Sequence, residues 1–557
     1  MTESQDFSTV LVKDKRIANI SDSVSYAVKK GGSNISVSKY RALSGVGSAN
    51  PSSLVFNLQV PSEQVVVDRA VRLEAELALT ITGTIPAGSA VGARLIDWAN
   101  RDGLGPYPLH QLFSTMTATI NNNTVSVQMQ QILPALVNMY DRREHNRWLS
   151  TTPTMPDNVC DYNDVTNTVA NPLGGYSNAL DQDLLPRGSF EILSITGNTA
   201  YAGPGAEAKT VVVTFKVSEF LMLSPFLWQE SPHQQGFLGV QTLNFQFQLS
   251  SLNRIYRTSG YCSDGTLASP AKVCSSITFN DANLVFQFLS LHPSDVIPSR
   301  NVVPMVELPV FQSSNFPVVN AGATSGQITT STFSLNQIPD KLIIWANKAQ
   351  ALQTNSDPDF AFVIESISVQ FNNSQGIMSN FTQYDLYRAS YESGSSQSWN
   401  CFKGSATRPD TGNASPAVIK TSGSFLVLDM ALQGLAISED FLAPSSIGQY
   451  SLAITLNLRN QTSQNISPVI NILTVNSGLF VVDRGQSSSF SGILDKSLVL
   501  NASQKESKDS WEVERIIGGA MSSTSASVGM AMKDKKMGCA GPASIGVANG
   551  KMQSRYK

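Results

Sequence analysis

The chain has little charge and few cysteines for its 557 residues. Charged side chains make up 15% of the sequence, whereas ordinary soluble domains carry about 25%. The formal net charge of -3 gives no indication of nucleic-acid binding, because proteins that bind nucleic acids carry a strong positive excess. The five cysteines are too few, and odd in number, for a disulfide framework. Serine, threonine, asparagine and glutamine replace the missing charge and favour strands and turns.

Long apolar runs are also absent. No stretch approaches the roughly 20 apolar residues that a membrane-spanning helix requires. The first residues, MTESQDFSTVLVKDKR, lack the apolar core of a signal peptide. We therefore expect the chain to be made in the cytosol and to fold in the cytosol or the nucleus.

Residues that carry out chemistry are scarce as well. The four histidines show no spacing typical of zinc ligands: His110, His145, His233 and His292. Cys262 and Cys274 flank a Ser/Gly-rich loop, and we interpret them as ordinary thiols, with a disulfide or a shared metal as the alternatives. The segment DRREHNR at 141–147 is interpreted as the solvated end of a helix. The sequence thus predicts no catalytic, cofactor-binding or metal-binding residue.

One segment is a near miss to a phosphate-binding loop, namely GPGAEAKT at 203–210. Ala208 stands where the pattern requires glycine. The segment also runs into the strand-like VVVTF, whereas a phosphate-binding loop opens a helix whose amides hold the phosphates. We predict no phosphate site there.

Strand patterning is abundant. In VRLEAELALTITG, residues 71–83, apolar and more polar residues alternate, which predicts a long strand with one buried face. Further strands are predicted at 210–220, 240–250, 277–291, 341–346, 424–432, 450–459 and 470–483. Many strands separated by Gly, Pro, Asn and Ser turns predict an all-β protein built of sandwiches or barrels.

One combination of elements occurs twice. Residues 115–140 and 366–393 each read as a strand, an asparagine-rich turn and a helical segment, and similar strands follow both in the same order. The first copy carries about 40 more residues of loop, which a surface connection tolerates. We interpret this repetition as a duplicated sandwich; the alternative is that any two sandwiches share such patterns.

The boundary between the copies is predicted at LHPSDVIPSRNVVPMVELPVF, residues 291–311, which contains four prolines. The predicted organisation has four parts: an N-terminal arm at 1–49, a first sandwich at 50–298, a second sandwich at 299–490 and a C-terminal tail at 491–557. The tail is rich in small and basic residues, and we expect it to be flexible or to be processed.

Four segments resemble a known family. They are SSLVFNLQVPSEQVVVDRAVRLEAELALTITGT at 52–84, YPLHQLFSTMTATINNNTVSVQMQQIL at 107–133, FSLNQIPDKLIIWANK at 333–348 and ISVQFNNSQGIMSNFTQYDLYRAS at 367–390. INNNTVSV, QIPDKLII and FNNSQG are the most specific parts. The chain resembles, over roughly residues 50–490, the double jelly-roll major capsid proteins of polinton-like viruses and virophages, within the adenovirus and tectivirus capsid lineage.

The resemblance implies both fold and function. We expect two tandem eight-stranded jelly rolls with short helices in the loops. We expect a structural subunit of the virion rather than an enzyme, without a cofactor. Three copies would form a pseudohexameric capsomer, and many capsomers would tile an icosahedral shell. The expected partners are other copies of the chain, penton and minor capsid proteins, and the genome or an internal membrane through the basic tail.

Two alternatives belong to other functional classes. One is a glycan-directed amidase on a paired jelly-roll scaffold, with carboxylates in the groove between the sandwiches. The other is a carbohydrate-binding protein on the same scaffold. A signal peptide would favour either one, so its absence argues against both.

The tail contains a candidate processing site. RIIGGAMS at 515–522 has an aliphatic residue, any residue and then Gly-Gly, the pattern after which adenovirus-type maturation proteases cut. Two glycines let an extended chain enter a narrow cleft. We predict cleavage between Gly519 and Ala520; the alternative is that the glycines end a short helix begun near Ser510. The released tail would carry basic residues toward genome phosphates or anionic lipid: Lys533, Lys535, Lys536, Lys551, Arg555 and Lys557.

Overall fold

The computed structural model describes most of the chain between residues 34 and 494. The described residues are 34–62, 64–98, 101–139, 142–162, 188–226, 236–250, 252–291, 298, 300–372, 374–408, 417–433, 444–483, 485–492 and 494. The predicted cleavage point at Gly519 and Ala520 and the basic residues of the tail lie outside this set.

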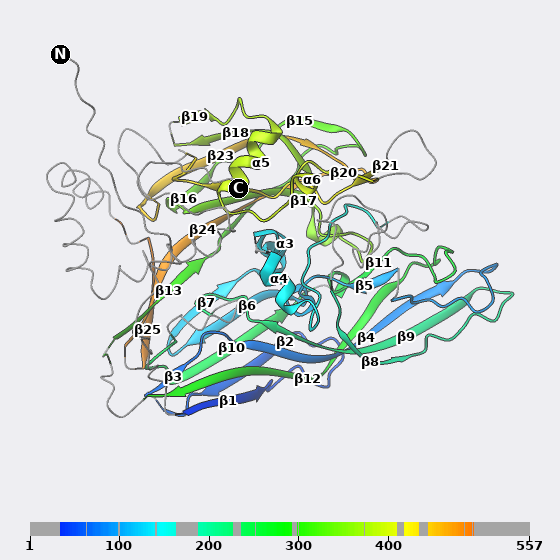
Figure 1. Ribbon diagram of the computed structural model, residues 1–557, viewed down its shortest axis with the longest axis horizontal. Helices are drawn as coiled ribbons and strands as arrows, with labels where there is room; N and C mark the ends of the chain where they lie inside the picture. The colour runs from blue at the N-terminus through cyan, green and yellow to red at the C-terminus, as the bar shows by residue number, and fades with distance from the viewer. Residues whose placement is uncertain are drawn as a thin grey trace, which may run out of the picture.

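The first half of the chain, residues 34–290, forms two packed antiparallel sheets (Figure 1). The large sheet has the order β1-β12-β4-β9-β8, with β3 beside β12, and the small sheet has the order β2-β10-β6-β7. The large sheet consists of β1 (Asn34–Arg41), β3 (Val65–Val67), β4 (Arg72–Ile85), β8 (Glu191–Thr196), β9 (Glu207–Phe220) and β12 (Val273–Ser290). The small sheet consists of β2 (Ser53–Gln59), β6 (Phe113–Ile120), β7 (Asn123–Val127) and β10 (Thr242–Leu249).

The second half, residues 300–491, repeats this plan. Its large sheet has the order β13-β24-β17-β22, with β14 and β25 beside β24; its small sheet has the order β15-β23-β18-β19, with β16 beside β23. The large sheet consists of β13 (Arg300–Glu307), β14 (Val310–Ser313), β17 (Lys341–Lys348), β22 (Leu426–Asp429), β24 (Pro468–Asp483) and β25 (Gln486–Ser491). The small sheet consists of β15 (Thr324–Thr329), β16 (Phe333–Gln337), β18 (Val363–Phe371), β19 (Ser374–Ile377) and β23 (Ile447–Arg459).

Short elements fill the connections. Two small ribbons are formed by β5 (Asp102–Leu104) with β11 (Tyr256–Thr258) and by β20 (Ser405–Arg408) with β21 (Ala417–Lys420). The helices are α2 (Pro108–Leu112), α3 (Met129–Met139), α4 (Arg142–Trp148), η2 (Leu252–Arg254), η3 (Gln350–Leu352), α5 (Gln383–Glu392) and α6 (Trp399–Phe402). In Figure 1, α3 and α4 lie between the two halves.

The predicted repeat occupies the same place in both small sheets. β6 is followed by a turn at Asn121, by β7 and by α3; β18 is followed by a turn at Asn372, by β19 and by α5. Both asparagines have positive φ, 52° and 50°, a backbone region that asparagine tolerates better than most residues. The repeated sequence pattern is therefore also a repeated structure.

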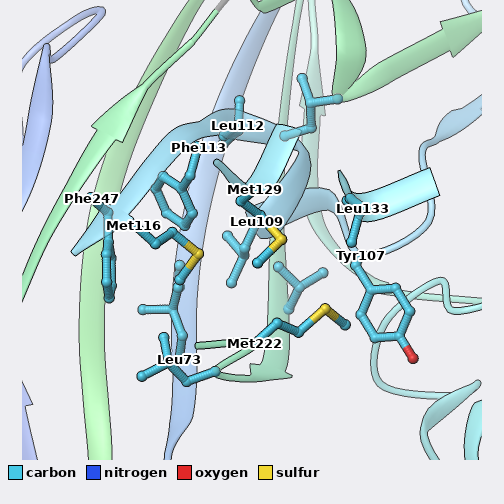
Figure 2. Close-up of a cluster of buried hydrophobic side chains, with 14 of the residues drawn as sticks. Leu73, Tyr107, Leu109, Leu112, Phe113, Met116, Met129, Leu133, Met222 and Phe247 are labelled. Carbon is cyan, nitrogen blue, oxygen red and sulfur yellow. The ribbon is translucent and has the colours of Figure 1, made fainter. Parts of the chain in front are cut away.

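The strand pattern predicted from the sequence explains the core. In β4 every second residue from Leu73 to Ile81 is buried, and the residues between them are partly exposed. Figure 2 shows how the first core continues beneath the helices: Leu109 of α2 and Met129 of α3 lie over Leu73. The second half has its own cluster around β18 and β23, with residues such as Ile367, Ile454 and Leu456.

Three details differ from the sequence-based expectations. Residues 34–41, assigned to the arm, form β1, because Tyr40 packs on Phe286 and Phe288 of β12. The strand predicted at 424–432 ends at Asp429, whose carboxylate accepts hydrogen bonds from the next turn. Of the segment 141–147, interpreted as a solvated helix end, the described part lies in α4; Asn146 and Arg147 are exposed as expected, but His145 is buried.

Candidate functional site at the junction of the two halves

The two halves meet through a buried charge cluster centred on Asp359. Its carboxylate accepts hydrogen bonds from Arg254, from Arg257 Nη2 at 2.9 Å and from Gln111 Nε2 at 2.9 Å. The donors belong to the first half, whereas Asp359 lies in the loop between η3 and β18 of the second half. The side chains of Arg254, Arg257 and Asp359 are 3%, 0% and 7% exposed. Water is therefore largely excluded from this ion pair.

Both arginines also donate to backbone carbonyls of the same loop. Arg254 Nη1 donates to Asp357 O at 2.9 Å and to Thr354 O at 3.3 Å. Arg257 Nη1 donates to Asp357 O at 3.2 Å. Burial lowers the pKa of Arg254, and the neighbouring Arg257 lowers it further, while Asp359 opposes the shift. The loop and both arginines thus form one unit that holds the halves together.

Asp357 completes the cluster on the side of the second half. Its carboxylate accepts from Lys348 Nζ and Gln464 Nε2, both at 3.0 Å, and from the Thr354 amide at 2.8 Å. Burial alone would raise the pKa of Asp357, but the hydrogen bonds from Thr354 and Lys348 outweigh it and lower the pKa below its usual value. Asp357 therefore carries a negative charge that balances the surrounding cations.

A third segment, residues 157–162 of the first half, also binds the second half. Asp157 Oδ2 accepts from the Asp359 amide at 2.7 Å, and Tyr162 donates to the same Asp157 carboxylate. Burial raises the pKa of Tyr162. The Ser463 amide of the second half donates to Asp161 Oδ2 at 2.7 Å. This segment therefore adds hydrogen bonds between the two halves beside the charge cluster.

Apolar contacts extend the junction. β17 is buried on both faces: Ile344 belongs to the core of the second half, whereas Ile343 and Trp345 belong to the cluster of the first half. Phe480 of β24 approaches Phe237 of the first half, with ring centroids 6.1 Å apart. A continuous apolar core therefore joins the two sandwiches, and the charge cluster belongs to the same junction.

His110 and Glu219 form a pair that resembles part of a catalytic dyad. Glu219 Oε2 lies 2.6 Å from His110 Nδ1, and its carboxylate also accepts from the Leu109 amide at 3.0 Å. The Met222 amide donates to His110 Nε2 at 3.1 Å. The Nε2 lone pair is therefore engaged, so the neutral tautomer carries its proton on Nδ1, and the ring is not placed to take a proton from a substrate.

A second buried pair lies inside the first half. Lys272 Nζ is 3.0 and 2.9 Å from the two carboxylate oxygens of Asp102 and donates to Tyr261 O at 2.6 Å. Thr258 Oγ1 donates to the same carboxylate at 2.7 Å, as does Tyr256. Burial raises the pKa of Tyr256 well above its usual value, and Asp102 adds to the shift. Asp102 and Lys272 are each saturated by partners, which suits a structural role.

The other residues discussed in the sequence analysis also lie in environments that suit a structural role. Cys262 and Cys274 are free thiols, as predicted. Lys209 of the near-miss phosphate loop lies in β9 and contacts Glu207 at 2.6 Å. Among the described residues no group of three or more His, Cys, Asp or Glu side chains could hold a metal ion. No helix in the described part of the chain is long and apolar enough to cross a membrane.

Sequence reasoning missed the junction cluster. Arg254 and Asp359 are 105 residues apart, and neither belongs to a recognisable motif. The available signal was weak: DPDF at 357–360 places two acidic residues in a loop, and NRIYR at 253–257 places two basic residues around a short apolar stretch. Neither segment indicates its partner.

Two family models match the chain. The model of the first domain of the Sputnik virophage major capsid protein matches residues 5–289, and that of the C-terminal domain of major capsid protein V20 matches residues 309–478. A curated relative, the putative capsid protein V20 of Sputnik virophage, is 26% identical over 528 residues. The match covers 92% of this chain and 84% of that protein.

Two solved structures share the fold. The structure of the Sputnik virophage by cryo-EM has a TM-score of 0.77 at 24% identity, covering 93% of this chain and 100% of that chain. The crystal structure of the mavirus major capsid protein has a TM-score of 0.70 at 13% identity, covering 90% and 99%. At such identities the likeness concerns the fold, and it confirms the predicted all-β fold of two tandem jelly rolls.

Proposed function

The chain belongs to the family of the Sputnik virophage major capsid protein, and from this premise we propose that it assembles as a trimer with six similar lobes. The family predicted from the sequence is thereby confirmed. The chain is a major capsid protein: a structural subunit of an icosahedral virus shell, located in the virion, that associates with copies of itself. Its family consists of structural capsid proteins and not of enzymes. The amidase and carbohydrate-binding alternatives gain nothing from these matches.

The two sandwiches in each chain support the proposed trimer. Three copies supply six sandwiches of similar topology, so a ring with three-fold symmetry offers nearly six-fold surroundings to its neighbours. Supporting this proposal, the strand order β12-β4-β9 recurs as β24-β17-β22, and β10-β6-β7 recurs as β23-β18-β19. The observation that carries the proposal is that two capsid-domain models match the chain in tandem.

We retain the four predicted parts as proposed domain limits: 1–49, 50–298, 299–490 and 491–557. The two sets of sheets, which span residues 34–290 and 300–491, support a boundary near 298. β1 would be the part of the arm that joins the first jelly roll.

The proposed partners beyond the trimer are penton and minor capsid proteins at the capsomer edges. The basic tail would contact the genome or an internal membrane. Cleavage between Gly519 and Ala520 would release that tail during maturation. Intact-mass measurement of the subunit from mature particles tests the cleavage: a chain that ends at Gly519 is expected, and a chain that ends at Lys557 would refute it.

Sedimentation of the purified full-length chain tests the trimer. A species of about three times the chain mass of 59.9 kDa is expected at micromolar concentration, because permanent interfaces in such assemblies bury about 2,000 Å² or more. A stable monomer under these conditions would refute the trimer. Electron microscopy of the concentrated protein then asks whether capsomers join into shells or curved sheets.

A further inference from the structure

Helix α5 presents an aromatic stripe on the surface of the second half. Tyr384, Tyr387 and Tyr391 follow each other at spacings of three and four residues, so they share one side of the helix. Tyr384 is 58% exposed and Tyr391 is 65% exposed. The ring centroid of Trp399 in α6 lies 5.3 Å from those of both Tyr384 and Tyr387. These four residues are called the α5 stripe below.

The opposite side of α5 is anchored. Leu386, Ala389 and Ser390 are buried, and Ser390 Oγ accepts a hydrogen bond from the Val427 amide of β22 at 3.0 Å. Thr382 and Asp385 form a capping box at the start of the helix. The stripe is thus held on a fixed support while its outer rings stay exposed. Tyr and Trp are enriched at protein interfaces because each combines a large apolar ring with a polar group.

The corresponding helix of the first half, α3, is covered. Eight of its eleven residues are buried. Ser396 of the second half donates to Asn138 O through Oγ at 2.8 Å and through its amide at 3.3 Å. The apolar residues of α3 belong to the same buried cluster as Ile343 and Trp345 of β17. The large sheet of the second half and α3 therefore belong to one apolar cluster, and α3 lies between the two halves (Figure 1).

The two halves are stacked in the same sense. In Figure 1, the small sheet of the first half and α3 face the large sheet of the second half, and the small sheet of the second half lies on the side away from the first half. β17 lies between β24 and β22, as β4 lies between β12 and β9. The surface of the first half that corresponds to the cover of α3 is thus the outer face of β4, with Glu74, Glu76, Ala78 and Thr80 partly exposed.

We propose that the α5 stripe of one copy packs against the outer face of β4 and β9 in a second copy. The inference rests on the trimer proposed above and assigns the surfaces through which its copies join. Within one chain, the large sheet of the second half faces α3 of the first half. Between chains, the large sheet of the first half of one copy would cover α5 of the neighbouring copy. Such a contact is heterologous, so three copies close a ring if each is rotated by one third of a turn.

The chemistry of the two surfaces agrees with this pairing. On the outer face of the large sheet, Glu76 of β4 lies opposite Lys216 of β9. Tyrosine rings stack on the aliphatic part and the charge of a lysine, and their hydroxyls donate to carboxylates. The buried side chains of α3 are mostly aliphatic. This suits a contact that forms once, while the chain folds. A surface that must stay exposed until a second copy arrives benefits from polar groups.

Two variants separate the two surfaces. The stripe variant is Tyr384→Ala with Tyr391→Ala, which truncates two exposed rings. The sheet variant is Ala78→Arg, which places a long charged side chain in the centre of the outer face of β4. Phe490→Ala, which removes a 49% exposed ring on β25, is the matched control. Circular dichroism and thermal unfolding of each full-length chain check that the fold is retained.

Sedimentation across a concentration series gives the first result. The stripe variant and the sheet variant should each associate about a hundredfold more weakly than wild type, since truncated interface anchors produce losses of this size. The Phe490→Ala chain should remain a trimer. A stripe variant that stays trimeric like wild type would overturn the inference, and so would a control that dissociates equally. A wild-type monomer would instead refute the trimer itself.

Mixing the two variants gives the second result. Each variant alone lacks one of the two surfaces, but a mixed pair retains one intact contact, between the stripe of the sheet variant and the sheet of the stripe variant. A one-to-one heterodimer, and nothing larger, is expected at concentrations up to about 100 μM. If no heterodimer forms there, the outer face of β4 and β9 is not the partner of the stripe, and the assignment fails.

Discussion

Asn372, directly after the end of β18, pairs with Ser451 of β23 through two hydrogen bonds. The Ser451 amide donates to Asn372 Oδ1 at 2.9 Å, and the Asn372 amide donates to Ser451 O at 2.8 Å. In the first half, Asn121 Oδ1 accepts from the Gln241 amide at 2.8 Å, and the Asn121 amide donates to Thr242 O at 2.9 Å. The same asparagine thus both turns the chain and ties the turn to the neighbouring strand in each jelly roll.

Replacing Asn372 should separate these two roles. Asn372→Ala places a poorly suited residue at a φ of 50° and deletes the acceptor, so it should lower the free energy of unfolding by about 2–3 kcal/mol. Asn372→Gly accepts the backbone conformation and should cost only about 1 kcal/mol. Denaturant unfolding of the three chains measures the order. Equal stability of the alanine and wild-type chains would contradict this order. Asn315→Gly serves as a control, because Asn315 is exposed and also has positive φ.

Asp359 should be a sensitive position of the junction. Asp359→Asn leaves Arg254 and Arg257 buried without their carboxylate, and removing one partner of a buried pair costs about 3–5 kcal/mol. Glu392→Gln is the matched control, because it breaks the exposed pair with Arg388 and should change stability by less than about 0.5 kcal/mol. Thermal unfolding compares the two. Similar small shifts for both would show that the cluster does not hold the halves together.

Asp357 predicts part of the acid sensitivity. Its pKa in the folded chain is lowered, below the unfolded value of about 3.9. The stabilisation from its ionised form is therefore fully present above the unfolded pKa and is lost as the pH falls through the folded pKa. We expect Asp357→Asn to be less stable than wild type near pH 6 and to lose less additional stability on acidification. The unfolding midpoints of the wild-type and Asp357→Asn chains, measured across the acidic range, show how steeply the stability of each chain falls with pH.

The pKa of Asp340 is shifted in the opposite direction from that of Asp357. Burial raises its pKa, although the Ser477 amide donates to its Oδ2 at 2.8 Å. Ionisation of Asp340 at neutral pH thus opposes folding, and this cost disappears as the pH falls through the raised pKa. Asp340→Asn should therefore gain stability relative to wild type as the pH rises through that value. If the stability of Asp357→Asn and that of Asp340→Asn, each relative to wild type, changed with pH in the same direction, these assignments would be contradicted.

The alternating strands and the repeated unit could be predicted because they are local. Leu73 to Ile81 reveal their burial by spacing alone, and the asparagines at 121 and 372 mark the turns. The junction could not be predicted, because pairs such as Arg254 and Asp359 meet only after both sandwiches have formed. His145 was misread for the same reason: its burial depends on Tyr107, whose hydroxyl lies 3.2 Å from Nδ1, and on Val137 O.

The cysteines predict a chemical signature of the folded chain. Burial raises the pKa of Cys160, of Cys262 and of Cys274, the last to about 12, and Cys401 is also buried. Thiols that are buried and protonated react slowly with disulfide reagents. A Cys539→Ser chain should therefore show no rapid thiol reaction at neutral pH until it is unfolded, when four thiols become reactive. Rapid reaction of the folded chain would show that a thiol is accessible.

Trp345 tests how the apolar junction is packed. It is 0% exposed on the side of β17 that faces the first half, and its ring centroid lies 6.2 Å from that of Phe425. Among the described residues, Trp345 Nε1 has no hydrogen-bond partner, and a buried unpaired donor costs about 1–3 kcal/mol. Trp345→Phe loses some packing but removes this donor, so stability should change by only about 1 kcal/mol. Trp345→Ala leaves a cavity and should cost about 3–5 kcal/mol. Denaturant unfolding compares the two variants. Equal losses would contradict the prediction, because the phenyl ring of Trp345→Phe would then recover none of the stability that the cavity of Trp345→Ala costs.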